Sequence, residues 1–409
     1  MNILDTIDPT VVGERLAEAR RARRLTQQQA AESLGVARTT ITAIEQGVRR
    51  PRAAELLTLA RLYGRQVGDL VRPIREQPGP SFIVQFRAAR GPASVIPNEE
   101  RDADSQRFEE FCRWYVELED LVGSPLPRRY PDIYDTSDTS PERAAEDVAT
   151  TERNRLGLGD GPIGDLWGIL ETDVGLRIFA MPMTSRKIAG MFLFSEDFGG
   201  CIAVNANHPE EKRRSTVAHE YAHFLTNDRY KPEITILSAY QRAPEGERFA
   251  EAFARNFLMP TAGLSRRYHA LRRAKDKPIT PADVLTLSHL YRVSFQTMIW
   301  RLEELKLLPS GAWNKFHSLG FKPNTARELL NLPASTPELS LLPLRYETLA
   351  AQSYMKGLLS EGQLARRLAT DRVSALLRVR QLSEESQLSE DGEWYQAGLD
   401  LNAALVGDS

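Results

Sequence analysis

Cysteine is scarce in this 409-residue chain, which contains only Cys112 and Cys201. Two cysteines so far apart do not make a disulfide framework, and their spacing is not that of a metal site, so the chain suits a reducing cytoplasm. A run of about 18 apolar residues is also missing, which argues against a membrane-spanning helix. The first residues have neither the basic nor the apolar stretch of a signal peptide. We therefore expect a cytoplasmic protein without a membrane partner.

A large excess of charge is missing too, because 53 lysines and arginines nearly balance 55 acidic residues. The total charge therefore predicts no nucleic-acid partner. Residues 1–75 are the exception, since they hold 13 arginines, no lysine and 8 acidic residues, which gives a net charge of +5. Binding to phosphate groups requires a basic segment of this kind. Because a chain of this length suggests two to four domains, we expect a basic N-terminal domain followed by others.

Residues 11–71 have the pattern of five short helices. Thr26 is a good N-cap for a helix over residues 27–34, and Gly35 ends that helix. The next helix is expected from about residue 37 to residue 46. A helix, a tight glycine turn and a second helix form the helix-turn-helix arrangement, whose second helix enters the major groove of DNA.

The outward side chains of this second helix are candidate base readers. Arg38 can bind guanine through two hydrogen bonds, and threonines can contact thymine methyl groups or phosphates. Gln27 and Thr40 are expected to contact the DNA backbone. We therefore predict binding to double-stranded DNA through Gln27, Arg38, Thr39, Thr40 and Thr42. The alternative is a helical bundle that makes only protein contacts, and a homodimer stays open.

The same segment resembles a known family. It reads Leu-Thr-Gln-Gln-Gln-Ala-Ala-Glu-Ser-Leu-Gly-Val from Leu25 onward, and then carries Ile41, Ile44, Glu45, Gly47 and Pro51. In these residues it is similar to the Cro/repressor (XRE) family of DNA-binding domains. The resemblance implies an all-α domain that binds DNA.

The strongest pattern in the chain is His-Glu-x-x-His at residues 219–223. Positions four apart lie one above the other on a helix, so His219 and His223 can bind one metal ion. Glu220 can then reach a water molecule on that ion. Two imidazoles with a carboxylate base are typical of zinc metallopeptidases. The alternative is a buried helix whose two histidines are merely hydrogen-bonded.

A site with two histidines needs a third protein ligand if one position is to stay open for water and substrate. Residues 247–260 predict an amphipathic helix with phenylalanine at every fourth position. Glu247 and Glu251 share another face of that helix. Glu247 could complete the metal site, and Glu251 could hydrogen-bond a ligand imidazole. The alternative is two glutamates exposed to solvent, which is the usual place for this residue.

These two segments together resemble the ImmA/IrrE family of bacterial metallopeptidases. The resemblance is carried by Arg-Ser-Thr-Val-Ala-His-Glu from Arg214, by Glu-x-x-Ala from Glu247, and by Phe-Ala-x-x-Phe-Leu-Met-Pro from Phe253. It implies that Glu220 is the catalytic glutamate and that the metal ligands are His219, His223 and Glu247. We expect Zn²⁺, although Mn²⁺ also fits these ligand types.

The chain departs from the family pattern at three positions. Glu251 stands where the family often has asparagine or aspartate, and Ala222 stands where it commonly has glycine. Asn227 stands where a further histidine is common. None of these changes removes a ligand. The residue that would stabilise the oxyanion is not identified by the sequence, and the candidates are Tyr230, Tyr240 and His269.

The fold class that we predict is mainly α with an α+β core. Three short strands over residues 176–180, 189–194 and 201–205 precede the motif helix. Residues 280–307 resemble another helix-turn-helix, although helices packed against the peptidase domain are the favoured interpretation. Residues 359–377 have a similar pattern and stay unassigned. The predicted parts are a helix-turn-helix domain (1–72), a linker and helical connector with one strand at 81–86 (73–142), a zincin-like metallopeptidase domain (143–265), a helix-turn-helix-like segment (266–335) and a helical C-terminal region (336–409).

We interpret the chain as a DNA-binding regulator with a zinc-dependent endopeptidase domain. Its expected partners are double-stranded DNA and a protein substrate, and the family resemblance implies that this substrate is a repressor or an antitoxin-like regulator. One alternative is a transcriptional regulator whose peptidase-like domain receives a signal without proteolysis. Another is a degenerate fold that binds no metal.

Overall fold

The computed structural model describes residues 9–23, 25–63, 67, 70, 98–230, 233–236, 244–275, 278–318, 320–332 and 342–385. The chain divides into two compact units, Met1–Gly79 and Pro80–Ser409. Each unit has hydrophobic core residues of its own. The strand expected at residues 81–86 lies outside the described residues, and the five-part division stays a prediction.

The first unit is helical, as the sequence predicts. Its helices are α1 (Pro9–Ala22), α2 (Gln27–Leu34), α3 (Arg38–Glu45) and α4 (Ala53–Tyr63), and residues 67 and 70 are also helical. Thr26 caps α2 by accepting a hydrogen bond from the backbone amide of Gln29 at 3.2 Å. Gly35 ends α2 in the left-handed region, with φ of 67°, where glycine has no steric penalty. The turn between α2 and α3 is therefore built as its residues predict.

A buried ion pair joins the helices of this unit. Arg20 from α1 donates to both carboxylate oxygens of Glu45 in α3, at 2.6 and 2.9 Å. Gln27 from α2 donates to the same carboxylate at 2.8 Å. Burial alone would raise the pKa of Glu45, but the bonds from Arg20 and Gln27 hold it below its usual value. The carboxylate is therefore charged at neutral pH, and it holds α2 against α3.

The second unit is built on a four-stranded sheet within the described residues. Its strands are β1 (Arg177–Met181), β2 (Ile188–Ser195), β3 (Gly199–Asn205) and β4 (Glu233–Ile236), in the order β1-β3-β2-β4. β1 and β3 are parallel, whereas β2 is antiparallel to both β3 and β4. The three strands predicted from the sequence correspond to β1, β2 and β3. β4 was not predicted.

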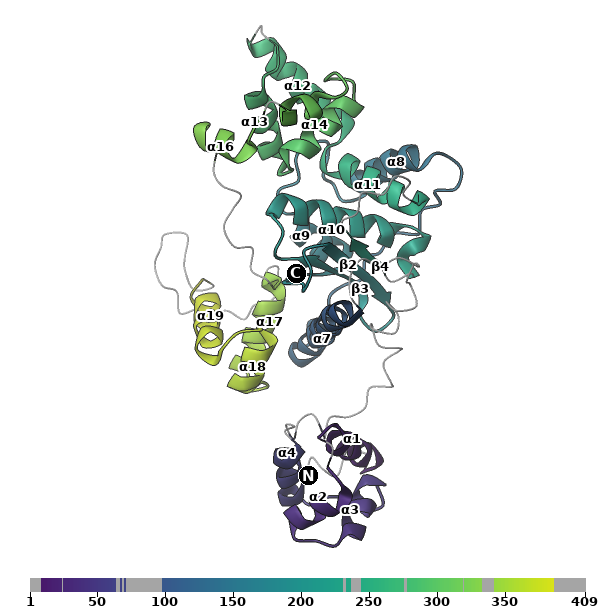
Figure 1. The fold of residues 1–409 in the computed structure, drawn as a ribbon, viewed down its shortest axis with the longest axis vertical. Helices are drawn as coiled ribbons and strands as arrows, with labels where there is room; N and C mark the ends of the chain where they lie inside the picture. The colour runs from purple at the N-terminus through teal and green to yellow at the C-terminus, as the bar shows by residue number, and fades with distance from the viewer. Residues whose placement is uncertain are drawn as a thin grey trace, which may run out of the picture. The chain divides into compact units, whose positions relative to one another are not determined.

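Helices cover both faces of this sheet (Figure 1). One face packs on α10 (Glu210–Leu225), behind which lie α11 (Glu245–Leu258) and α8 (Pro141–Arg155). The other face packs on α7 (Asn98–Val122) and on α17 (Leu344–Met355), α18 (Glu361–Arg367) and α19 (Arg372–Glu385). Successive side chains of a strand point to opposite faces, so Phe192 joins the first layer while Met191 and Leu193 join the second. The predicted fold class, mainly α with an α+β core, is confirmed.

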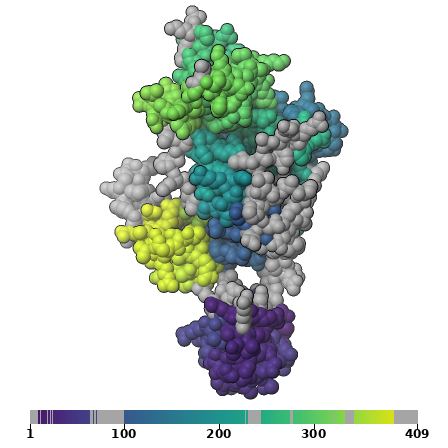
Figure 2. Space-filling view, in the orientation of Figure 1, coloured from purple at the N-terminus to yellow at the C-terminus, as the bar shows by residue number. Residues whose placement is uncertain are grey.

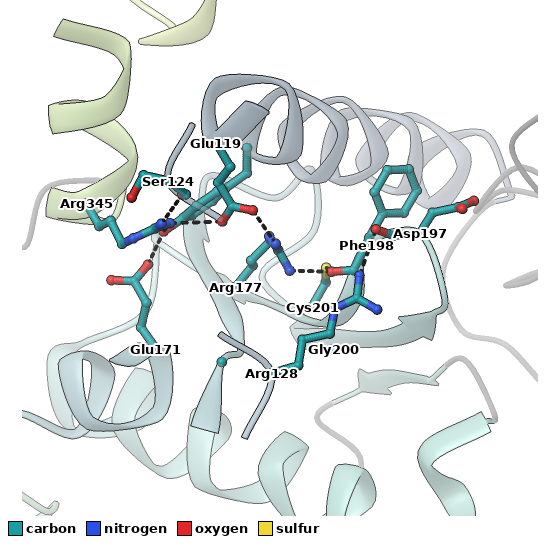
Figure 3. A network of polar contacts seen from close by, with 12 residues as sticks. Glu119, Ser124, Arg128, Glu171, Arg177, Asp197, Phe198, Gly200, Cys201 and Arg345 are labelled. Carbon is teal, nitrogen blue, oxygen red and sulfur yellow. Dashed lines mark hydrogen bonds and ion pairs between the residues drawn. The ribbon is translucent and has the colours of Figure 1, made fainter. Parts of the chain in front are cut away.

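Charged residues tie the second layer to the sheet (Figure 3). Glu119 from α7 accepts from Arg177 of β1 at 2.6 Å and from Arg345 of α17 at 2.9 Å. The Arg177 and Glu119 side chains are each only 3% exposed. Cys112 and Cys201 are free thiols buried in the same layer, and burial followed by a hydrogen bond with Cys201 raises the pKa of Cys112. The C-terminal helices therefore belong to the same compact unit as the sheet.

The remaining helices precede the sheet, lie between α10 and β4, or follow α11 in the chain. They are α9 (Leu166–Ile169), the π-helical turn η2 (Leu170–Val174), the 3-10 turn η3 (Asn227–Tyr230), α12 (Thr261–Lys275), α13 (Pro281–Tyr291), α14 (Phe295–Glu304), α15 (Ala312–Ser318) and α16 (Pro323–Leu329). Arg301 of α14 is buried against α11, where it donates to the side chain of Asn256 at 2.6 Å. α14 is thus packed against the motif-bearing layer, as the favoured interpretation expected. Among the described residues, no helix has the length and apolar character needed to cross a membrane.

Candidate functional site

The helix α10 carries the His-Glu-x-x-His pattern and is enclosed along its second half. Every residue from Thr216 to Leu225 is buried, because the sheet packs on one side and α11 on another. Its N-terminus is acidic, which suits the positive end of the helix dipole. There Glu210 pairs with Arg292 at 2.9 Å, and Glu211 pairs with Arg327 of α16 at 2.7 Å. The helix is therefore held at both ends, which fixes the direction of its side chains.

Three potential ligand atoms converge at this helix. Nε2 of His219 and Nε2 of His223 lie 3.2 Å apart. The carboxylate of Glu247, in the first turn of α11, lies 3.5 Å from the first nitrogen and 3.6 Å from the second. All three atoms fall within 4.8 Å of one another. The structure thus brings together the three residues that the sequence singled out from two separate segments.

These distances fit a metal ion. Ligand atoms at the corners of a tetrahedron, each about 2.0–2.2 Å from zinc, are about 3.3–3.6 Å from one another. The nitrogen separation of 3.2 Å lies next to that range, and each imidazole nitrogen has one Glu247 oxygen near it, Oε2 at 3.5 Å from His219 and Oε1 at 3.6 Å from His223. A hydrogen bond between the imidazoles would explain the first separation but not the approach of one carboxylate to both rings. His219, His223 and Glu247 can therefore hold an ion and leave a fourth position for water or substrate.

The carboxylate beside the Nδ1 atom of His223 is a different one from that expected. Glu251 is 62% exposed, and its carboxylate lies 4.0 Å from Arg255 on the next turn of α11. Asp228 in η3 instead lies 3.7 Å from Nδ1 of His223. Gly246 leaves room for it, since a Cβ there would be 2.8 Å from the Asp228 carboxylate. The sequence did not single out Asp228, although it lies five residues after the second histidine.

Glu220 points toward the sheet. Its side chain is completely buried, and it lies beside Gly190 of β2. A Cβ at position 190 would lie 2.8 Å from Oε1 of Glu220 and 2.6 Å from Cγ2 of Thr216. The pairing of β2 with β4 is irregular at the same place, between Ile188 and Gly190. A glycine inside a strand often marks such a close approach, and that signal could have identified Gly190 from the sequence.

Aromatic rings and a buried carboxylate set the distance between α10 and α11. Phe253 and Phe257 of α11 pack against Tyr221 of α10, with ring centroids 5.9 and 5.8 Å away. The Tyr221 hydroxyl donates to Glu152 of α8, which also pairs with Arg155 at 2.7 Å. Burial, followed by the charge of Glu152, raises the pKa of Tyr221 well above its usual value. The Tyr221 hydroxyl therefore stays protonated and donates to Glu152. The packing of Tyr221 on α11 helps to hold Glu247, which lies on that helix, opposite the two histidines.

The predicted DNA contacts lie on α2 and α3. Arg38 and Thr39 are exposed at the start of α3, whereas Gln27, Thr40 and Thr42 are half-buried. The Thr42 hydroxyl donates to Oε1 of Gln27 at 3.3 Å, while the amide nitrogen of Gln27 is bonded to Glu45. Gln27 therefore has a structural role in the first unit. Arg38 and Thr39 present open side chains to a ligand.

The three oxyanion candidates are placed less completely. Tyr240 and the side chain of Tyr230 lie outside the described residues. His269 is exposed on α12, where it lines a cavity of about 980 Å³ together with Arg266, Arg272 and Arg273.

Comparison with known proteins agrees with both parts of the chain. Residues 171–303 match the family model of the IrrE N-terminal-like domain, and residues 11–74 match that of a helix-turn-helix domain. Both resemblances predicted from the sequence are thereby confirmed. No curated protein matches the chain.

Two solved structures align with most of the chain at very low similarity. The crystal structure of Bacillus thuringiensis PlcR in complex with the peptide PapR7 and DNA has 12% sequence identity and a TM-score of 0.17, covering 91% of this chain and 93% of that one. The crystal structure of ComR from Streptococcus suis has 10% identity and a TM-score of 0.16, covering 92% and 91%. At these TM-scores the two alignments carry no argument about fold or function.

Proposed function

Because the chain joins a helix-turn-helix domain to an IrrE N-terminal-like domain, we propose that it is a DNA-binding regulator with a metal-dependent endopeptidase site. The observation that carries the proposal is the convergence of His219, His223 and Glu247 beside the buried Glu220. A site that only stabilised the fold would need the three ligands. It would not need a fourth, acidic side chain held in place by a glycine in the neighbouring strand.

One atom from each of His219, His223 and Glu247 would hold the metal. Zn²⁺ is our choice, and Mn²⁺ also fits a set of two imidazoles and a carboxylate. When bound, such an ion lowers the pKa of a water molecule and polarises the carbonyl group of a peptide bond. Asp228 orients His223 by attracting the Nδ1 side of its ring, which leaves Nε2 for the ion.

Glu220 acts as the general base and then as the general acid. Its carboxylate accepts a proton from the attacking water, and it later gives that proton to the amine of the cleaved peptide bond. Such a transfer requires the carboxylate to stay within hydrogen-bond reach of the reacting atoms. The absence of a side chain at Gly190 leaves the space that Oε1 of Glu220 occupies.

The substrate that we propose is an extended segment of a specific regulatory protein, such as a repressor or an antitoxin-like regulator. Gly190 of β2 lies beside Glu220, and it pairs with Thr235 of β4. The sheet edge nearest Glu220 is therefore the β4 edge. An extended peptide can add to such an edge through backbone hydrogen bonds.

The DNA-binding part of the proposal places α3 in the major groove. Arg38 and Thr39 are exposed at its first turn, where base contacts are made in helix-turn-helix domains. Thr40 and Thr42 lie on the flank and contact the DNA backbone, whereas Gln27 supports α3 through its bonds with Glu45 and Thr42. A cytoplasmic location follows from a DNA partner and a regulatory substrate.

The test compares two glutamate-to-glutamine changes. Glu220→Gln keeps the size of the side chain but removes the base, whereas Glu251→Gln alters an exposed side chain one turn beyond the site. New protein N-termini would be labelled in a cell lysate incubated with each zinc-loaded chain. We expect the native and Glu251→Gln chains to create the same new termini and Glu220→Gln to create none while still binding about one zinc.

Two results would contradict the proposal. A native chain that binds no zinc after loading has no peptidase site. A regulator whose peptidase-like domain only receives a signal would create no new termini in any of the three forms, although it would still bind DNA.

A further inference from the structure

The helices α18 and α19 repeat the local structure of α2 and α3. Both pairs begin with the same capping box, formed by Thr26 with Gln29 and by Ser360 with Gln363. In each box the hydroxyl accepts from the amide three residues on, and the glutamine side chain accepts from the capping residue. Thr26 and Ser360 are 334 positions apart, and so are Gln29 and Gln363. The first helix of both pairs therefore starts in the same way.

The turns also correspond at this spacing. Both turns contain a left-handed residue at the matching position, Gly35 with φ of 67° directly after α2 and Ala369 with φ of 50° two residues after α18 ends. In each turn the next amide donates to the carbonyl five residues earlier at 3.0 Å, namely Val36 to Ala31 and Thr370 to Ala365. The second helix starts three residues after the left-handed position in both. The two turns therefore share the left-handed residue, the hydrogen bond that follows it and the length of the connection to the second helix.

The inward residues follow the same order. The buried positions of the first pair are matched, again 334 positions later, by buried positions of the second: Ala30, Ala31 and Ile41 by Leu364, Ala365 and Ala375. Arg372 opens α19 as Arg38 opens α3. The repeat therefore includes the side chains that hold the helices together and the first outward cation.

A left-handed turn alone would not carry this inference, as α13 and α14 show. These helices are joined through Arg292, whose φ is 51°. Phe295 at the start of α14 is buried, however, and it packs on Phe316 and Phe321 with ring centroids 5.9 and 4.9 Å away. The second helix of that pair is thus used inside the fold.

The outward face of α19 is open and basic. Arg372 and Ser374 are exposed, and so are Val373 and Leu377, at 68% and 55%. The acidic residue beside them, Asp371, accepts from the amides of α19 and caps the helix. Figure 2 shows α17–α19 in yellow at the molecular surface. Cations with exposed apolar groups on one helix face suit guanine edges, phosphates and thymine methyl groups.

Other arginines of this module are already used within the unit. Arg367 pairs with Glu117 of α7, and Arg378 pairs with Glu347 of α17, each at 2.7 Å. The inward arginines are thus neutralised, while Arg366 and Arg372 project to the exposed side. We propose that α18 and α19 form a second DNA-binding site, in which α19 enters the major groove of double-stranded DNA. This site is separate from the proposed peptidase site and does not depend on it.

The experiment uses the full chain with the first DNA site disabled by Arg38→Ala. This protein would select duplexes from a random-sequence pool of 40 base pairs, and anisotropy would measure the affinity for the selected duplexes. Adding Arg372→Ala should lower that affinity by roughly 5- to 150-fold, the usual effect of losing one arginine contact to a guanine. Adding Lys356→Ala instead removes an exposed charge at the end of α17, outside the helix pair. This change should alter the affinity for the selected duplexes by less than twofold.

Three outcomes would overturn the inference. The first is that the Arg38→Ala chain selects no duplexes. The second is that Arg372→Ala lowers the affinity for DNA no more than Lys356→Ala does. The third is that Leu377→Asp changes the sedimentation mass but not the affinity for DNA, which would assign this face to a second copy of the chain. Because Arg372 is exposed, we expect the Arg372→Ala chain to fold normally, and circular dichroism would check this. The Arg372→Ala and Lys356→Ala changes are both made in the Arg38→Ala chain, so the comparison between them does not depend on the contacts of α3.

Discussion

Substitution of Gly190 by alanine tests whether the sheet positions the catalytic carboxylate. The added Cβ would lie 2.6 Å from Cγ2 of Thr216, 2.8 Å from Oε1 of Glu220 and 3.1 Å from the carbonyl oxygen of Ala203. The first two separations are too short for any carbon to occupy, so at least two side chains must move. Overpacking of this kind costs about 1–3 kcal/mol of unfolding free energy. We expect the melting temperature to fall by roughly 2–10 °C.

The effect on catalysis should be larger than the effect on stability. A misplacement of about 1 Å in a reacting group can lower a rate by about 100-fold. We therefore expect Gly190→Ala to lower the rate at which new protein N-termini appear by about that factor, with zinc content unchanged. Gly161→Ala is the matched control, because a Cβ there meets nothing within 4 Å.

A second substitution distinguishes the contact of the new Cβ with Thr216 from its contact with Glu220. Thr216→Ser removes the methyl group that the new Cβ meets first, and it keeps the hydroxyl that donates to the Lys212 carbonyl oxygen at 3.0 Å. The chain with both Gly190→Ala and Thr216→Ser should regain part of the lost stability but not the lost activity, since the Glu220 contact remains. Full recovery of activity in that chain, or an unchanged rate in Gly190→Ala alone, would refute the role assigned to Gly190.

Three further results are expected. Asp228→Asn should weaken zinc binding by about 10- to 100-fold, whereas Glu251→Gln should leave it unchanged, as measured by competition with a chelator. Removal of zinc held at about 100 times its dissociation constant should cost about 2.7 kcal/mol, so chelation should lower the melting temperature of the native chain but not that of His223→Ala. Glu119→Leu should cost about 3–5 kcal/mol in thermal or urea unfolding, because it leaves the buried Arg177 guanidinium without its carboxylate. A loss below about 1 kcal/mol would contradict that role.

The parts of the site that could be predicted from the sequence depend on local periodicity. His219 and His223 are one helical turn apart, so their convergence follows from helix geometry alone. Glu247 was identified because the helix that carries it is amphipathic and has its own pattern. The two turns of the first unit were also predictable, because Thr26 and Gly35 act within a few residues of their own positions.

The parts that could not be predicted depend on contacts between distant segments. Glu247 and Glu251 share a helix face, but one turn moves a side chain by about 5.4 Å, which takes Glu251 past the site to the surface. Asp228 reaches His223 only because the chain turns back in η3 after α10. β4 has just four residues and no strong pattern, so its pairing with β2 is visible only in the folded sheet.

The alternation of β2 explains why the site and the C-terminal helices belong to one compact unit. Gly190 leaves space for Glu220 on the α10 face, and the next residue, Met191, packs into the layer formed by α7 and α17–α19. Phe192 returns to the α10 face. A single strand therefore faces Glu220 with one set of residues and the layer of α7 and the C-terminal helices with the other. Met191 and Leu193 share one buried cluster with residues of α7 and of α17–α19, so a boundary drawn after Glu247 would remove part of the apolar layer to which they belong.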